Sequence, residues 1–238
     1  MSSDWRFQKA PIWGFFFAMS GFILGKKGEQ EQTFDDKGER IPATHIKTSP
    51  CYLIDIKQEE KHGYFAVLLG FGLRKNIQKP VLGQLKKAGI KTPLRFLKEI
   101  RLEKKETIIE KDGKKGIKIN EKEIFVGSEI TPSLFFKKGD FVNVTGKSKG
   151  KGFQGVVRRH HFKGGPRTHG QSDRERAPGS IGQTTTPGRV YKGKRMAGRM
   201  GGDRVIIKNL KVVEAKEDEL VVKGLVPGTR GGLLEIKN

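Results

Sequence analysis

The sequence predicts a mainly β protein built on a β-barrel. Short apolar segments of strand length recur along the chain, glycine-rich turns separate them, and only one short segment has clear helical spacing. This succession favours a barrel over a parallel α/β sheet, in which each strand would be followed by a long helical segment. The 238 residues suit one large domain or two small ones.

The first strands lie near the start of the chain. Phe22–Leu24 is expected to be the first buried strand. Thr33–Phe34 and Arg40–Ile46 are expected to pair as a hairpin, with Gly38 supplying the left-handed position at its tip. Two further strands are expected at Tyr52–Lys57 and Tyr64–Gly70.

The middle of the chain contains the predicted helix. Leu82, Leu85 and Ala88 share one helical face, so a short helix is expected over Val81–Ala88 with Gly89 ending it. Short strands are then expected at Ile100–Glu103, Thr107–Glu110 and Gly116–Asn120.

The last strands lie on either side of a long glycine-rich segment. Phe141–Thr145 alternates as a strand before it. Val205–Val213 and Leu220–Lys223 are expected to pair after it, and Gly232–Ile236 is the last expected strand.

The glycine-rich segment, residues 146–204, concentrates positive charge. It has fifteen Lys and Arg but only three Asp and Glu, so it carries +12 of the formal net charge of +22. Large apolar residues are scarce in it, so it cannot bury enough surface to fold by itself. It therefore needs a polyanion as partner.

RNA fits this segment better than DNA. No helix is predicted in it that could enter a major groove, whereas an extended basic arm can follow the crevices of folded RNA. Phe153, Phe162 and Tyr191 are available to stack on bases, although each could equally pack beneath the loop.

Two nucleotide-binding patterns lie in the same segment. Gly150–Gly155 matches G-x-G-x-x-G, and Asp173 and Glu175 follow about twenty residues later. The residues after the glycines, Val156–His161, are expected to be extended, whereas the dinucleotide fingerprint requires a helix there. A nucleotide (NAD or ATP)-binding enzyme is the alternative hypothesis. The end of a P-loop at Gly146–Ser148 fails because the earlier glycine is replaced by Phe141.

No metal or cofactor is expected. His160, His161 and His169 have no cysteine or helical spacing to complete a metal site, and adjacent histidines on a strand point to opposite faces. Contacts with RNA are the favoured role for them. Cys51 is the only cysteine, which excludes an intrachain disulfide, and is expected to be a small, partly buried apolar residue.

Residues 1–18 are predicted to be an N-terminal extension. The apolar run 11–24 is shorter than the roughly 20 residues that span a bilayer, and no A-x-A-like cleavage site follows it. The extension is interpreted as a docking tail or as sequence upstream of a start at Met19. Binding of 11–24 and the basic loop to an anionic membrane is a third hypothesis; no membrane partner is the favoured expectation.

Several long motifs resemble the universal large-subunit ribosomal protein L3 family, in its bacterial (50S) form. They are Val144–Phe153 (VTGKSKGKGF), Thr168–Gly170 (THG), Pro178–Gln183 (PGSIGQ), Thr186–Val190 (TPGRV) and Lys192–Gly198 (KGKRMAG). Met19–Lys27 is similar to the opening of that family. Glu29–Glu31 departs from the family's Gly-Met-Thr.

The resemblance implies a Greek-key-type β-barrel with an inserted small α+β element and a long, basic, glycine-rich loop. The barrel is expected from 19–70 and 121–238, the insert from 71–120 and the RNA-penetrating loop from 146–204. The protein would be a structural component of the cytoplasmic ribosome and not an enzyme. It would help to nucleate subunit assembly, and the loop tip near 164–182 would approach the peptidyl transferase centre.

The resemblance also implies partners and a modification. The partners would be large-subunit rRNA, large-subunit proteins fourteen and nineteen, and a glutamine methyltransferase acting on Gln183. The residues expected to contact RNA are Lys147, Lys149, Lys151, Arg158, Arg159, His160, His161, Lys163, Arg167, His169, Arg174, Arg176, Arg189, Lys192, Lys194, Arg195 and Arg199.

Overall fold

The computed structural model describes residues 21–34, 38–102, 108–111, 113–119 and 122–238. The predictions for residues 1–18, for Met19 and for most of the apolar run 11–24 lie outside the described residues. Within the described ranges, no helix is long and apolar enough to cross a membrane.

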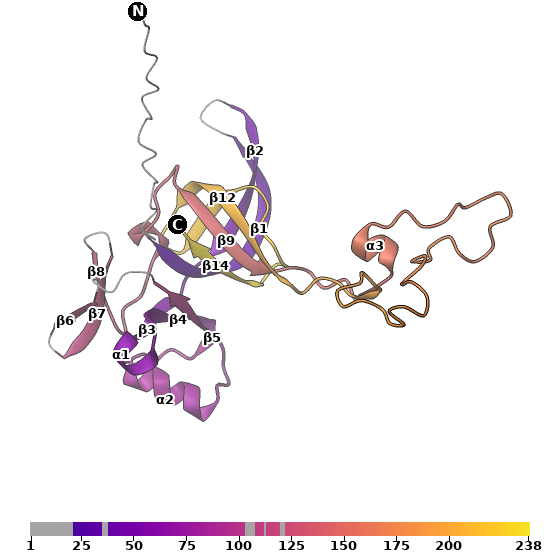
Figure 1. The fold of residues 1–238 in the computed structure, drawn as a ribbon. Helices are drawn as coiled ribbons and strands as arrows, with labels where there is room; N and C mark the ends of the chain where they lie inside the picture. The colour runs from indigo at the N-terminus through magenta and orange to yellow at the C-terminus, as the bar shows by residue number, and fades with distance from the viewer. Residues whose placement is uncertain (1–20, 35–37, 103–107, 112, 120–121) are drawn as a thin grey trace, which may run out of the picture.

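Six antiparallel strands form a closed barrel in the order β1-β14-β9-β12-β13-β2 (Figure 1). They are β1 (Phe22–Phe34), β2 (Arg40–Lys47), β9 (Phe141–Lys147), β12 (Arg204–Ala215), β13 (Glu219–Lys223) and β14 (Leu233–Lys237). Apolar side chains from all six strands fill the interior, and those of Phe22, Ile46, Val144, Leu220 and Ile236 are fully buried. The predicted barrel class is confirmed.

The strand pairs expected near the two ends of the chain are also confirmed. The first hairpin closes with Phe34 opposite Arg40, and Gly38 at its tip has φ +77°. Near the other end of the chain, Val212 on β12 lies opposite Val222 on β13. Residues 35–37 of the hairpin tip lie outside the described part of the chain.

A three-stranded sheet packs beside the barrel. It consists of β3 (Cys51–Lys57), β4 (Ala66–Leu73) and β5 (Leu94–Arg101), with the short helix α1 (Glu59–His62) between β3 and β4. Val67 and Leu69 on β4 join the barrel core, whereas Leu68 faces a second cluster that contains Leu85 of α2 (Lys79–Lys87). The helix confirms the prediction over 81–88, and Gly89 follows its end with φ +74°.

Strand pairing departs from the expected grouping of residues 51–70 with the barrel. The strands β3 and β4 pair with each other and with β5, not with any barrel strand. The apolar run of β4 is buried on both faces because it is the central strand between the barrel and α2. The length of the apolar run predicted that β4 is a strand, but not which sheet it joins. The division of the chain into domains stays a prediction.

A third, smaller sheet completes the inserted region. It contains β6 (Ile108–Lys111), β7 (Lys114–Ile119) and β8 (Lys122–Phe125), and a 3₁₀ turn, Pro132–Leu134, leads back to the barrel. Cys51 is fully buried beside the barrel, as a small apolar residue would be, and burial raises the pKa of its thiol to about 12.

The glycine-rich segment leaves the barrel at the end of β9 and returns at the start of β12 (Figure 1). It contains the two-residue strands β10 (Phe153–Gln154) and β11 (Gly198–Arg199) and the helix α3 (Val156–His160). The prediction that 156–161 is extended is wrong. Val156 is buried and Arg159 N donates to Gly155 O at 2.9 Å, so packing overrides the β preference of the two valines.

Candidate nucleic-acid interface

The extension, residues 147–204, starts as a narrow two-stranded stalk. Lys147 lies opposite Arg204, and Ser148 N donates to Asp203 O at 2.8 Å. Further out, Lys151 N donates to Met200 O and Met200 N donates to Gly152 O, each at 2.9 Å. These backbone bonds continue the pairing of β9 and β12 beyond the barrel.

A glycine allows the two antiparallel segments of the stalk to pack closely against each other. Gly201 has φ +77°, and a Cβ built on it would lie 2.1 Å from Lys149 O. No side chain can occupy that space, so any other residue would push the strands apart. The two segments of the stalk therefore pack closely at this point, and the stalk is thin.

The helix α3 braces the outer end of the stalk. Arg159 Nη1 donates to Met196 O at 2.7 Å, and His160 Nε2 lies 3.1 Å from the same oxygen. A Cβ on Gly198 would lie 2.5 Å from Arg159 Nη1, so the guanidinium packs directly on the returning chain. Arg159 and His160 thus have a structural role that the charge pattern did not reveal.

The distal loop is held mainly by its own backbone. Gly165 N donates to Glu175 O at 2.8 Å, and Arg167 Nε lies 2.8 Å from Glu175 Oε1. One of the three acids of the extension is therefore engaged by a local arginine. The basic residues of the extension still outnumber its acidic residues.

The side chains of the extension are almost all outside any core. Val156 is the only buried side chain between residues 147 and 204, all of which the structure describes. The predicted contact residues group along three parts: the stalk has Lys147, Lys149, Lys151 and Arg199; α3 and its end have Arg158, Arg159, His160 and His161; the distal loops have the rest. All are exposed except Arg159 and His160, which are half-buried.

The histidines are arranged differently from the expectation. His160 ends α3 and His161 follows it in the left-handed region, so the two do not alternate across a strand. His160 packs against Phe162 with ring centroids 6.1 Å apart. No three His, Cys, Asp or Glu residues in the described ranges could together hold a metal ion.

Partly buried polar contacts lie at the base of the extension. Glu235, nearly buried on β14, lies 3.0 Å from both Arg204 Nη2 and Lys98 Nζ. The ammonium of Lys27 donates to Val226 O at 2.6 Å and to Gly228 O at 3.1 Å. Burial and then the charge of Lys149 lower the pKa of Lys27. These contacts fix where the stalk leaves the barrel.

The structure does not build the dinucleotide site of the alternative hypothesis. A helix does follow the glycines, against the expectation, but α3 has only five residues. β10 and β11 are antiparallel, and added Cβ atoms at Gly150 and Gly155 would meet nothing within 4 Å. The fingerprint requires a parallel βαβ unit with close packing at its glycines.

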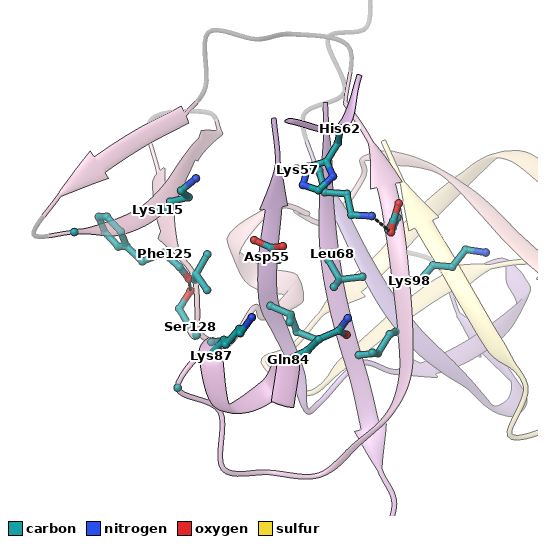
Figure 2. A pocket seen from close by; sticks show the side chains of 18 residues that line it. Asp55, Lys57, His62, Leu68, Gln84, Lys87, Lys98, Lys115, Phe125 and Ser128 are labelled. Atoms are coloured by element: carbon teal, nitrogen blue, oxygen red, sulfur yellow. Dashed lines mark hydrogen bonds and ion pairs between the residues drawn. The ribbon is translucent and has the colours of Figure 1, made fainter. Parts of the chain in front are cut away.

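A groove of about 1430 Å³ lies in the inserted region, between the β3-β4-β5 sheet, α2 and the β7–β8 strands (Figure 2). No sequence motif marks it. Lys57 at its wall pairs with Glu99 (Figure 2). Tyr64 Oη also donates to Glu99, at 2.9 Å. These hydrogen bonds raise the pKa of Lys57 and lower that of Glu99. The charge of Lys57 is thus already neutralised within the protein, while Lys87, Lys98 and Lys115 also line the groove.

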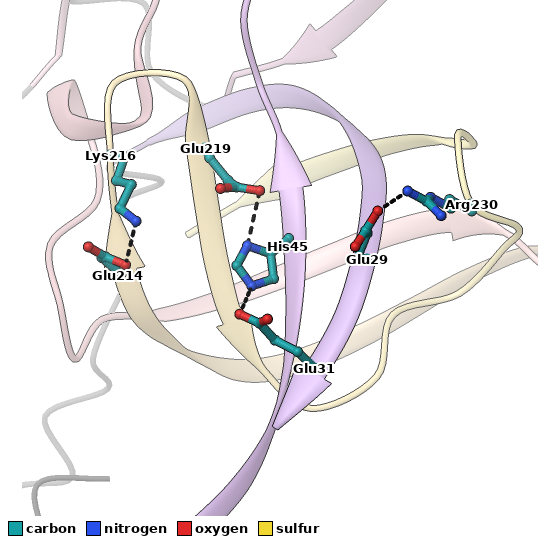
Figure 3. A network of polar contacts seen from close by, with 7 residues as sticks. All are labelled: Glu29, Glu31, His45, Glu214, Lys216, Glu219 and Arg230. Carbon is teal, nitrogen blue, oxygen red and sulfur yellow. Dashed lines mark hydrogen bonds and ion pairs between the residues drawn. The ribbon is translucent and has the colours of Figure 1, made fainter. Parts of the chain in front are cut away.

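Internal pairing also characterises the barrel surface (Figure 3). His45 on β2 lies between Glu31 on β1 and Glu219 on β13, with Nδ1 3.0 Å from the Glu219 carboxylate. Arg230 pairs with Glu29 nearby. The barrel thus pairs charges across its strands, which the extension largely does not.

The fold and the site together define a protein that holds a polycationic, glycine-rich extension out from a closed barrel. The family model for Ribosomal protein L3 matches residues 96–220. The chain is 46% identical to large ribosomal subunit protein uL3 of Herpetosiphon aurantiacus over 218 residues, which cover 90% of this chain and 94% of the relative. The proteins of the same name from Chlorobaculum tepidum and Dehalococcoides mccartyi are 46% and 43% identical, over 91% and 90% of this chain and 97% and 96% of theirs.

The chain therefore belongs to the ribosomal protein L3 family, as the motifs indicated. Membership makes it a structural protein of the cytoplasmic ribosome. The family is one of non-enzymatic components.

Proposed function

We propose that the protein is a constituent of the large ribosomal subunit that binds large-subunit (23S-type) rRNA through its extension. The observation that carries this proposal is the fifteen-to-three excess of basic over acidic residues on a segment with one buried side chain. Such a segment gains most from a partner that supplies dense negative charge. Relatives named as large-subunit proteins cover nine-tenths of the chain, which supports the choice of partner.

In this proposal the basic side chains, the stalk and the barrel have different roles in binding. The exposed lysines and arginines would neutralise phosphates and release counterions, which provides affinity without sequence preference. The stalk, thin because of Gly201, would enter crevices too narrow for a side-chain-covered element. The barrel, rigid and self-paired, would hold the stalk at a defined angle and help to nucleate subunit assembly.

The resemblance extends the proposal to the loop tip and to neighbours. The tip near 164–182 would approach the peptidyl transferase centre, and large-subunit proteins fourteen and nineteen would adjoin the protein. Gln183 is exposed in the distal loop, so its amide is accessible to a glutamine methyltransferase before assembly.

A binding experiment with the full chain tests the proposal. We expect tighter binding to a transcript of large-subunit rRNA than to random RNA of equal length at physiological salt. The logarithm of affinity should fall linearly with the logarithm of salt concentration, by about 0.7 to 0.9 per phosphate contact. Equal affinity for the two RNAs would contradict rRNA recognition, and a flat salt dependence would contradict the electrostatic mechanism.

A further inference from the structure

The small sheet β10–β11 in the stalk has two different faces. Phe153 lies opposite Arg199, and Gln154 lies opposite Gly198. Partners across an antiparallel ladder share a face, and successive residues alternate between faces. Phe153 and Arg199 therefore share one face, and Gln154 and Gly198 share the other.

The face with Gly198 is covered by the protein itself. A Cβ added to Gly198 would lie only 2.5 Å from Nη1 of Arg159 on α3. The same Nη1 donates to Met196 O at 2.7 Å. The absence of a side chain at residue 198 is what allows α3 to close on this face.

The face with Phe153 is open. Its ring is 73% exposed, more than any other large apolar side chain in the described part of the chain. Arg199 beside it is exposed as well. By contrast, Phe162 is half-buried next to His160, so the structure separates two aromatic residues that the sequence left equivalent.

The backbone around Phe153 is held in place. Lys151 N and Met200 N donate across the stalk just before it, and the β10–β11 pair includes it. A side chain on a pre-ordered backbone loses little conformational entropy when it binds. An aromatic ring with only two rotatable bonds adds little to that cost.

The surroundings select the kind of partner. Between residues 147 and 172 the extension has no Asp or Glu, while Lys149, Lys151 and Arg158 lie near Phe153 in the chain. A phosphodiester strand offers negative charge beside flat bases, and aromatic side chains in basic grooves stack on such bases.

We propose that Phe153 is a stacking platform for an unpaired RNA base, with Arg199 on the same face meeting the adjacent phosphate. This inference rests on the proposed function and names the nucleotide feature that the stalk would recognise. The ring supplies a contact that does not depend on salt, next to charges that do.

Substitutions at Phe153 and at Phe34 provide a matched test. Phe34 is 71% exposed at the far end of the β1–β2 hairpin, so Phe34→Ala removes an equally exposed ring elsewhere. With a transcript of large-subunit rRNA as probe, Phe153→Ala should weaken binding about 5- to 140-fold, the range for loss of one stacked base. The salt slope should stay the same. Phe153→Leu should lose as much, whereas Phe153→Trp should bind like the wild type.

Fluorescence distinguishes the partner. Emission from Trp in Phe153→Trp should be quenched by the rRNA transcript, while Phe34→Trp, with the same native Trp5 and Trp13, should not change. If wild type binds rRNA and Phe153→Ala matches Phe34→Ala, the inference is overturned but the proposed function is not. Full affinity in Phe153→Leu, or quenching by purified large-subunit proteins instead of rRNA, would also overturn it by indicating apolar docking. Absence of wild-type binding would overturn the proposed function itself.

Discussion

The barrel and the extension use charge in opposite ways. On the barrel, Glu235 lies within 3.0 Å of two cations, and His45 is shared by two carboxylates on neighbouring strands. On the extension, fifteen basic residues face three acids, and one side chain is buried. The barrel thus completes its interactions internally, whereas the extension leaves most of its interactions to be made with a partner.

The largest difference between the two regions should appear when charge is removed from each. Substitution by Gln of six exposed cations of the extension should lower rRNA affinity and reduce the salt slope by about 4 to 5. Between about 50 and 200 mM salt, the variant should therefore lose about 250- to 1000-fold less affinity than the wild type. The six are Lys149, Lys151, Arg158, Lys163, Lys192 and Lys194.

The control removes the same charge from the inserted region. Six of its exposed lysines serve for this, namely Lys61, Lys75, Lys79, Lys86, Lys87 and Lys91. Filter binding over a salt series should give a much smaller change in slope for this variant, and both proteins should melt near the wild-type temperature. Equal losses from the two sets would mean that the whole protein, and not the extension, attracts RNA.

Core truncation should have the reverse effect. Phe22 is fully buried in the barrel, with its ring centroid 5.4 Å from that of Phe135. Phe22→Ala should lower the free energy of unfolding by about 3 to 5 kcal/mol, measured by urea denaturation. Phe34→Ala, at a 71% exposed site, should change it by less than about 0.5 kcal/mol. The two values would be similar only if the barrel core did not carry the stability.

Two glycines with the same φ allow the cost of backbone strain to be measured separately from the cost of a steric clash. Gly201 and Gly38 both have φ +77°, but an added Cβ meets Lys149 O at 2.1 Å in the first case and nothing within 4 Å in the second. Gly38→Ala should cost about 1 to 2 kcal/mol of backbone strain. Gly201→Ala should also open the stalk, so that trypsin cleaves the free protein's extension about tenfold faster.

The comparison is limited trypsin digestion of both variants beside the wild type, without RNA. Faster cleavage within 147–204 in Gly201→Ala alone is the expected result. Equal cleavage in the two variants would mean that the φ angle, and not the packed stalk, maintains the pairing.

The smallest expected effect is a pH dependence of the free energy of unfolding that arises from Cys51, buried beside the barrel. The pKa of Cys51 is raised to about 12 from 9.0 because its thiol is fully buried. The folded state therefore keeps the proton while the unfolded state loses it, so this contribution to stability is complete below about pH 9 and declines between about 9 and 12. At pH 10 the loss should be about 1.4 kcal/mol relative to pH 8.

Cys51→Ala supplies the reference, since only the wild-type minus variant difference isolates the thiol. Urea denaturation of both proteins at pH 8 and pH 10 measures it. A difference that stays constant between the two pH values would show that the thiol is accessible to solvent in the folded protein. RNA affinity should not depend on this substitution at either pH.

Local patterns predicted much of what the structure contains. The barrel strands around 141–145, 205–213 and 220–223, the helix over 81–88 and the αL glycine at residue 38 follow from apolar spacing and glycine chemistry, which act over a few residues. The location of the net charge is a property of composition alone. These features need no knowledge of what packs against them.

Other features depend on contacts between distant residues. Which sheet β3 and β4 join was decided by the barrel on one side and α2 on the other. The helix α3 forms where β-branched valines favour a strand, because Val156 is buried and Arg159 reaches Met196. No local pattern contains that information.

The sequence by itself thus determined that this protein has strands, a basic glycine-rich segment and the motifs of its family, since those depend on residue type and spacing. The tertiary structure alone decided that the segment is a thin stalk with one face covered by Arg159 and the other open at Phe153. The physical reason is that exposure is a relation between residues far apart in the chain: Gly198 and Arg159 make the covered face, and only folding brings them together.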